Sequence, residues 1–301
     1  MKKRMMMAVL VGSSLLVAQN SFASAVSITP RASVGINHYS LKWQVSNWGN
    51  DTGTSDFADV GDDLLTGGAG LTLAAGKFYF DASFEQTMEG SDDETYDYAY
   101  YDTDFDVFAY ALTLGYNITG GLSVFAGWNS HETSFTDQFS YTDSVLSALD
   151  PLDGETEFSA DGWFLGLSYG WNLFEDSTLS IKAAYALLDG DLTSRYDSYS
   201  FYSYEGSNTI YYSRNHVTIN NDGGDATGMT IGVAWKSYLT DSLSYSITAD
   251  WYKYTFDDFS GNEITVDWGY DNEGPQQYYD DSSSDVEEES YIFRFALSYQ
   301  F

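Results

Sequence analysis

The chain ends in YIFRFALSYQF, residues 291–301, where two kinds of side chain alternate. Aromatic and large apolar residues occupy every odd position, whereas the even positions hold Ile292, Arg294, Ala296, Ser298 and Gln300. Because successive side chains of a β-strand point to opposite faces, this pattern predicts a strand with one aromatic face and one mostly polar face. What lies against each face decides the class of protein.

The same period-two pattern recurs along the chain, and no stretch shows the 3.6-residue period of an amphipathic helix. In residues 163–173, for example, tryptophan, leucine and tyrosine alternate with smaller residues, mostly glycine and serine. The sequence therefore predicts about ten strands of roughly ten residues each, with eight to twelve strands compatible with the pattern. They are expected at residues 31–43, 64–74, 77–88, 107–117, 122–132, 163–173, 179–188, 229–236, 243–252 and 291–301.

The connections between these strands alternate in length. Short turns are expected at Ala75-Gly76 and at residues 117–121, 175–177 and 240–242. Long, polar and acidic connections are expected at residues 44–63, 89–106, 133–161, 189–228 and 257–290. Tight turns at one end and long loops at the other are typical of an antiparallel up-and-down meander.

The composition of the two faces separates the possible architectures. The largest apolar residues share one face of nearly every strand, and glycine, serine and threonine fill most of the other. A soluble β-sandwich, the alternative, would also alternate, but it would bury its apolar face and expose a larger polar one. An apolar exterior around a small, polar interior predicts an all-β, transmembrane up-and-down β-barrel with short periplasmic turns and long extracellular loops.

The N-terminus carries an export signal pattern. Lys2, Lys3 and Arg4 precede an apolar stretch at residues 5–18, and the small residues 23–25 then fit a cleavage site. This arrangement predicts a signal peptide at 1–25 and a single mature domain at 26–301. An N-terminal membrane anchor is the alternative, but the apolar stretch is short for a span of about 20 residues.

Composition limits the partners and the source of stability. The formal net charge is −33, which disfavours binding to nucleic acid. There is no cysteine, so no disulfide can stabilise the fold. Aromatic residues make up 18% of the chain, which argues against disorder despite the charge.

The signal peptide, the alternating strands and the terminal FALSYQF together resemble the outer-membrane β-barrel proteins of Gram-negative bacteria. In that family an alternating last strand that ends in Phe is an assembly signal, and the matching positions here are Phe293, Phe295, Leu297, Tyr299 and Phe301. The resemblance implies an outer-membrane location and, as partners, membrane lipid, lipopolysaccharide and the barrel-assembly machinery. A monomer is expected.

If Phe293 and Phe295 face lipid, Arg294 faces the lumen, because a cation on the lipid face near the midplane costs roughly 2–4 kcal/mol. The same assignment around the barrel predicts a charge network of both signs in a narrow interior, with side chains such as Tyr79, Phe125 and Phe164 filling much of the space. The alternative is a narrow aqueous pore. The predicted inward set is Arg31, Asp81, Glu85, His131, Lys182, Lys236, Asp250 and Arg294.

The acidic segments suggest weak metal binding at most. Asp102, Asp104 and Asp106 resemble the start of a calcium loop, but Val107 and Thr113 stand where an EF-hand needs Gly and Glu. Acidic clusters at 92–94, 280–281 and 287–289 are candidates for weak Ca²⁺ or Mg²⁺ binding, which could bridge to lipopolysaccharide phosphates. The alternative is a solvated acidic surface with no bound ion and no cofactor.

No catalytic site can be assembled from the sequence. The strand count is similar to that of the omptin proteases, whose sites pair an Asp–His couple with two aspartates, but Arg214 stands two residues before His216 where an Asp is expected. His131 beside Ser130 fits a rim histidine, and His38 has no metal ligands at suitable spacing. The sequence therefore favours a structural or surface-interaction protein with a filled lumen, with a narrow channel and an omptin-like protease as alternatives.

Overall fold

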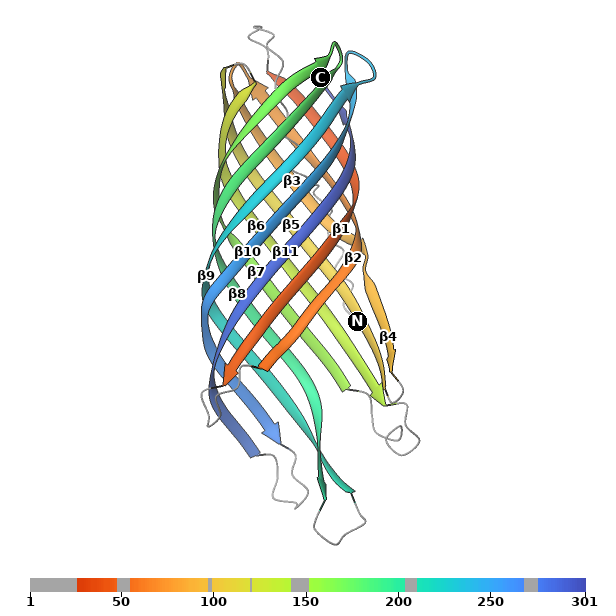
Figure 1. Cartoon of the computed structure of the whole chain (residues 1–301), viewed down its shortest axis with the longest axis vertical. Coiled ribbons are helices and arrows are strands. Elements are labelled where there is room, and N and C mark those ends of the chain that lie inside the picture. Colours follow the sequence, from red (N-terminus) through yellow and green to blue (C-terminus); the bar gives the residue numbers. More distant parts are fainter. Residues whose placement is uncertain are drawn as a thin grey trace.

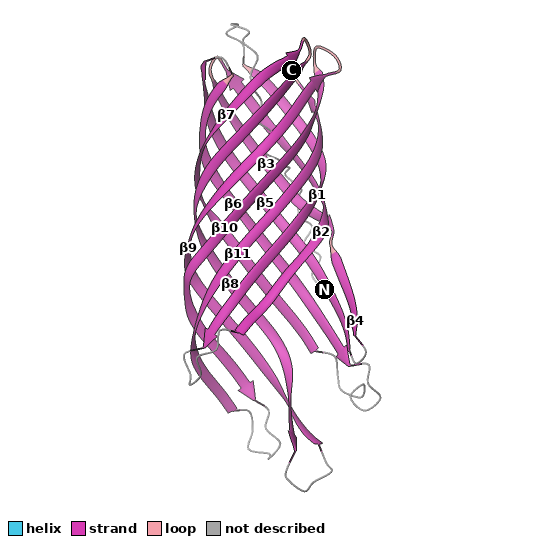
Figure 2. Cartoon of the chain, in the orientation of Figure 1, coloured by secondary structure: helices cyan, strands magenta, loops and turns pink. Residues whose placement is uncertain are grey.

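The computed structural model describes residues 26–47, 55–96, 99–119, 121–141, 152–203, 210–267 and 276–301, and these form strands and tight turns only (Figure 2). The predicted signal peptide lies outside them. None of the described residues forms a helix long and apolar enough to cross a membrane. The strands are β1 (Ser27–Asn47), β2 (Ser55–Ala75), β3 (Phe78–Glu89), β4 (Ser91–Tyr96), β5 (Ala99–Thr119), β6 (Leu122–Tyr141), β7 (Leu152–Phe174), β8 (Ser177–Ser203), β9 (Ile210–Tyr238), β10 (Leu243–Asp267) and β11 (Gln276–Tyr299).

Apart from β3 and β4, each strand pairs antiparallel with its neighbour in sequence, and β1 pairs with β11 to close the barrel (Figure 1). β3 and β4 both pair with β5, so they are two halves of one strand and the barrel has ten strands, as predicted. Between them, the Thr87 hydroxyl donates to the Val107 carbonyl (3.3 Å) and accepts from the Val107 N–H (3.0 Å), replacing the missing ladder bonds. Closure leaves no unpaired edge inside the bilayer.

The tight turns gather at one end of the barrel, together with the C-terminus (top in Figure 1). Gly76 (φ 61°) and Gly121 (φ 94°) supply the left-handed conformations that turn β2 into β3 and β5 into β6. At the β9–β10 turn, the Thr240 hydroxyl accepts hydrogen bonds from the N–H groups of Ser242 and Leu243. These turns lie where the sequence predicts them.

The half of the barrel next to the tight turns has an apolar exterior. On β7, Trp163, Leu165 and Leu167 point outward and are more than half exposed, whereas the inward Gly166 and Ser168 are buried. The same arrangement continues around the other strands. An exposed apolar band around a closed barrel is the lipid-facing surface of a membrane barrel.

The predicted long loops are wrong over most of their length, because the strands continue well beyond the apolar band. Strands β8 and β9 form the furthest-reaching hairpin, with β10 and β11 beside it (bottom in Figure 1). In these extensions the two faces exchange character: on β7, Glu155, Glu157 and Asp161 point outward, while Phe158 points inward and is fully buried. A strand outside the bilayer needs a polar exterior and an apolar interior, which is why its sequence reads as an acidic loop.

The interior of the extended half is packed like the core of a soluble protein. We call the following set the apolar layer; each member is at most 2% exposed and belongs to one continuous cluster: Tyr39, Leu41, Leu64, Phe135, Phe158, Leu192, Ile219, Phe256 and Val286. The rings of Phe158 and Phe256 meet edge to face, with centroids 5.0 Å apart.

Candidate functional site in the barrel interior

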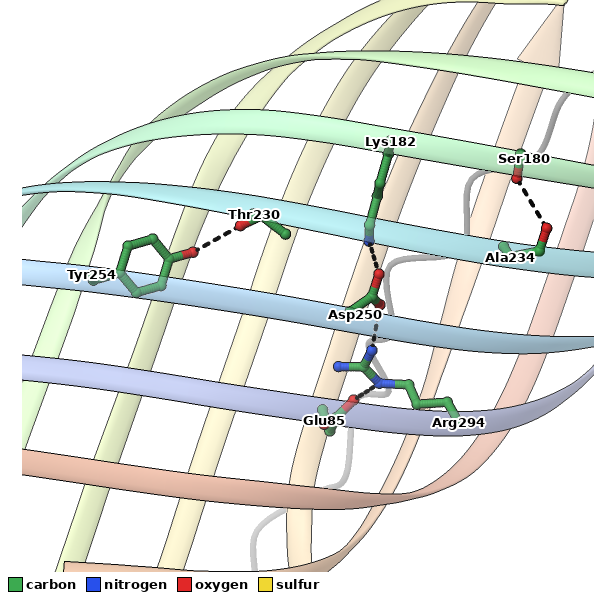
Figure 3. Close-up of polar contacts among 8 residues, drawn as sticks. All are labelled: Glu85, Ser180, Lys182, Thr230, Ala234, Asp250, Tyr254 and Arg294. Carbon is green, nitrogen blue, oxygen red and sulfur yellow. Dashed lines mark hydrogen bonds and ion pairs between the residues drawn. The ribbon is translucent and has the colours of Figure 1, made fainter.

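The inward residues form a charge network at the level of the apolar band. Arg294 on β11 stands at its centre: its Nε donates to Glu85 on β3, and its Nη1 donates to Asp250 Oδ2 on β10 at 2.7 Å (Figure 3). Lys182 Nζ on β8 lies 2.8 Å from the other oxygen of Asp250. These four side chains are at most 12% exposed, so four strands are tied together across the interior.

A second ion pair joins β1 to β3 nearby. Arg31 contacts Asp81 through two parallel hydrogen bonds, Nη1 to Oδ1 at 2.7 Å and Nη2 to Oδ2 at 2.8 Å. The Thr72 hydroxyl donates to Asp81 Oδ1 at 2.5 Å. Gly70 makes room for the guanidinium, because a Cβ there would collide with it. Two-point pairing of this kind satisfies both partners in a poorly hydrated space.

The network is electrically balanced. Arg31, Lys182 and Arg294 contribute three positive charges, and the three carboxylates that they contact contribute three negative charges. Buried ions of this kind are tolerated because each has a partner, and removal of one leaves another uncompensated.

Two predicted members of the inward set, Lys236 and His131, lie outside the charge network. Lys236 makes none of the ion pairs found among the described residues, and its Nζ lies 4.8 Å from the centre of the Tyr238 ring. His131 is not at the rim: it is 5% exposed and lies deep in the barrel, stacked on Tyr254 with ring centroids 6.0 Å apart. The number of residues from the tight turn predicts how deep a side chain lies in the barrel. It does not predict which side chains on other strands it contacts, because the strands are tilted.

His131 contacts a residue that the sequence reading missed. Its Nε2 lies 2.7 Å from Oε2 of Glu288, whose side chain is fully buried, although the two atoms are not aligned as a hydrogen bond. The Tyr252 hydroxyl donates to the other oxygen of Glu288 at 3.4 Å. The sequence predicts an acidic loop at Glu288, but on β11 this residue alternates in step with Ser290 and Ile292, which point inward.

Large inward side chains fit because glycines on neighbouring strands leave them space. A Cβ on Gly115 would overlap the Tyr79 ring, and one on Gly166 would overlap Phe125. Alternation of large and small inward residues is the usual way in which a narrow barrel is filled. Tyr79 and Phe125 are nearly buried, as expected for residues that fill the lumen.

A cavity of about 180 Å³ remains between the charge network and the His131–Glu288 pair; we call it the lumen cavity. Its wall includes Tyr79, Phe125, Phe164, Tyr254 and Ile292. The charged groups of Glu85, Lys182, Asp250 and Arg294 border it as well, and all four are engaged in the network.

Beyond the apolar layer one inward carboxyl is half-buried. Asp137 on β6 accepts a hydrogen bond from the Thr103 hydroxyl at 2.7 Å. Burial raises the pKa of the Asp137 carboxyl above its ordinary value, and this hydrogen bond only partly opposes the shift.

The outer wall of the extended strands is strongly acidic. Asp161, Asp189 and Asp225 stand directly opposite one another on β7, β8 and β9, and all three are exposed. Asp102, Asp104 and Asp106, which resemble the start of a calcium loop in sequence, lie within strand β5 and not in a loop. The described residues contain no group of three or more His, Asp or Glu side chains placed to hold a metal ion.

The β8–β9 hairpin carries an Asp–His contact that the chain spacing did not reveal. His216 Nδ1 contacts Asp197 across the two strands, and Arg214 contacts the other oxygen of the same carboxylate. His216 is about half exposed and points away from the barrel interior. His38, on β1, is likewise on the outer wall, with its Nδ1 2.8 Å from Asp63.

The last strand lies at the seam of the barrel. Its outward residues Phe293, Phe295, Leu297 and Tyr299 are all more than 40% exposed within the apolar band, and Phe301 is 75% exposed. The Phe301 N–H donates to the Ile28 carbonyl at 3.0 Å, which ties the end of the chain to β1. Strand β11 pairs with β1 on one side and with β10 on the other, so it joins the two ends of the chain's strand order.

Comparisons with known proteins identify the fold class. No family model matches the chain, and no curated protein sequence matches it closely. Among solved structures, the outer membrane protease OmpT from Escherichia coli superimposes with a TM-score of 0.63 over 94% of this chain and 99% of that chain, at 15% identity. The outer membrane protein OprG from Pseudomonas aeruginosa aligns over 92% of this chain and 96% of that chain, at 10% identity and a TM-score of 0.38.

The chain therefore has the fold of a closed, ten-stranded outer-membrane β-barrel. At 15% identity the likeness to OmpT shows the fold alone.

Proposed function

We propose that this chain is a sealed outer-membrane barrel with a structural or surface-interaction role. The observation that carries the proposal is the double closure of the lumen. The charge network crosses the interior at membrane level, and the apolar layer fills it further out. An ion on the axial path would have to break paired charges and then enter a packed apolar core, and both steps are costly.

The outer wall supports a surface role. Rows of exposed carboxylates face the region just beyond the lipid band, where lipopolysaccharide and its divalent counter-ions gather. Like charges directly opposite each other on neighbouring strands repel, so counter-ions would relieve this strain. Lipopolysaccharide as a partner, weak Ca²⁺ or Mg²⁺ association, the monomeric state and signal-peptide cleavage remain part of the proposal.

Thiol labelling tests the seal, and the absence of native cysteine makes single-cysteine variants unambiguous. Ala184 lines the lumen cavity, whereas Asp161 is exposed on the outer wall. A charged methanethiosulfonate reagent should label Asp161→Cys fully before Ala184→Cys reacts at all. Equal labelling rates at the two positions would favour the open-pore alternative.

The terminal strand is proposed to be the assembly signal for the barrel-assembly machinery. Deletion of Phe301 should slow assembly because it removes an exposed aromatic ring and a main-chain tie to β1. The expected result is a lower level of folded protein in the outer membrane, with export across the inner membrane intact. Wild-type levels of heat-modifiable protein after the deletion would remove this role.

One observation keeps a protease as the second candidate. Asp197 and His216 form an Asp–His contact on the β8–β9 hairpin. Against it, Arg214 shares the carboxylate and the pair faces outward. Cleavage of basic peptides by the purified barrel that His216→Ala abolishes would replace the structural role with this one.

A further inference from the structure

The charge network presents a spare hydrogen-bond donor to the lumen cavity. Arg294 donates from Nε to Glu85 and from Nη1 to Asp250, but its third nitrogen, Nη2, has no partner among the described residues (Figure 3). Nη2 points toward the side of Thr230 and Tyr254, two residues of the cavity wall, and it keeps accessible surface there. A guanidinium edge with two N–H groups therefore faces the cavity.

Other polar groups of the network also reach the cavity. The side chains of Lys182, Glu85 and Arg294 all border it, and each is 12% exposed although it lies inside the barrel. Lys182 Nζ carries three N–H groups and has one ion-pair contact, with Asp250 at 2.8 Å. Asn129 adds an amide to the same wall. Charged groups in an enclosed space are costly unless their donors find acceptors, so the remaining N–H groups call for an occupant that accepts hydrogen bonds.

The size and polarity of the cavity point to water as that occupant. Cavities lined only by apolar groups stay dry, whereas a polar cavity holds water when each molecule finds about two to four partners. The lumen cavity, at about 180 Å³, has room for several water molecules, since each takes up about 30 Å³ in the liquid. An additional ion is less favourable, because the charges of the network are already paired in equal numbers.

We propose that the lumen cavity holds a cluster of ordered water molecules that accept hydrogen bonds from Arg294 Nη2 and Lys182 Nζ. This water hydrates the charge network at membrane level, where neither the lipid nor the apolar layer can do so. It is a structural ligand of the barrel, enclosed between the charge network and the apolar layer. The proposal goes beyond the structural role and does not depend on it, because a hydrated cavity is compatible with a sealed barrel and with a pore.

Substitutions at Ala184, which borders the cavity, distinguish a hydrated cavity from a dry one. Ala184→Ser adds a hydroxyl that cavity water can hydrogen-bond, so the equilibrium constant of unfolding should stay within about threefold of the wild-type value. Ala184→Leu displaces water and leaves donors of the network without acceptors, so it should raise that constant by about tenfold or more. A dry cavity predicts the reverse order, because leucine would fill space and serine would bury a hydroxyl without a partner.

Ala160→Ser is the matched control in a dry environment. Ala160 is 2% exposed and belongs to the same apolar cluster as Phe158 and Phe256. A hydroxyl placed there has no water to bond, so the equilibrium constant of unfolding should rise by about five- to a hundredfold. Urea unfolding in detergent micelles measures all three variants.

The S–H stretching band of Ala184→Cys gives a readout that is independent of stability, since the chain has no native cysteine. Its infrared band should be broader and lie at lower wavenumber than that of Ala160→Cys, as expected for a thiol that donates to water. The proposal is overturned if the two bands coincide, if Ala184→Ser costs as much as Ala160→Ser, or if Ala184→Leu is more stable than the wild type. Should Ala184→Leu fail to fold, the serine comparison and the thiol band decide.

Discussion

Replacement of Arg294 by alanine should lower the free energy of unfolding by about 3–5 kcal/mol, the usual cost of removing one partner from a buried ion pair. The change would leave the carboxylates of Glu85 and Asp250 facing each other with only Lys182 to balance them. Water that enters the vacated space would soften the loss, so the lower end of the range is expected. Urea unfolding in detergent micelles, followed by tryptophan fluorescence, measures the effect.

Lys253→Ala is the matched control. Lys253 forms an ion pair with Glu287 at 2.7 Å, but both side chains are 38% exposed. Exposed pairs contribute about 0–1 kcal/mol, so this variant should unfold almost as the wild type does. Equal losses for the two variants would mean that burial of the Arg294 network adds nothing to stability.

Phe256→Ala should destabilise the barrel by about 3–5 kcal/mol, because it opens a cavity in the apolar layer. The side chain is fully buried, and its ring packs against Phe158. Phe174→Ala removes the same ring from a position that is 71% exposed at the tight-turn end and should cost far less. A loss at Phe256 no larger than that at Phe174 would contradict a packed interior beyond the membrane.

The sequence predicted the membrane half of this barrel well. The separation of apolar and small residues on alternate positions identifies the strands, the tight turns and the inward position of Arg294. Within the membrane, apolar side chains face the lipid and polar side chains face the interior, so polarity indicates the direction of a side chain. The pattern of residues 163–173 is the clearest case, and each predicted strand core lies in an observed strand.

The extended half was misread because its polarity is reversed. On the β7 extension the acids alternate with Phe158 and Ala160, which is a strand pattern with the core on the other side. The inward position of Glu288 was not predicted for a related reason. Glutamates stand on both sides of it, so the sequence shows no alternation of polar and apolar residues there. The pairing of Arg31 with Asp81 depends on strand tilt and on the space left by Gly70. Neither can be predicted from the residue pattern of one strand.

Current through the wild-type barrel in a planar lipid bilayer tests the sealed lumen most directly. The Arg294→Ala/Phe256→Ala double variant weakens both the charge network and the apolar layer. It should conduct ions with a preference for cations, because the carboxylates of the network remain. Its current also serves as the positive control that inserted barrels are detected. We expect the wild type to insert without steady conductance. A steady current from wild-type barrels, proportional to voltage, would contradict the account.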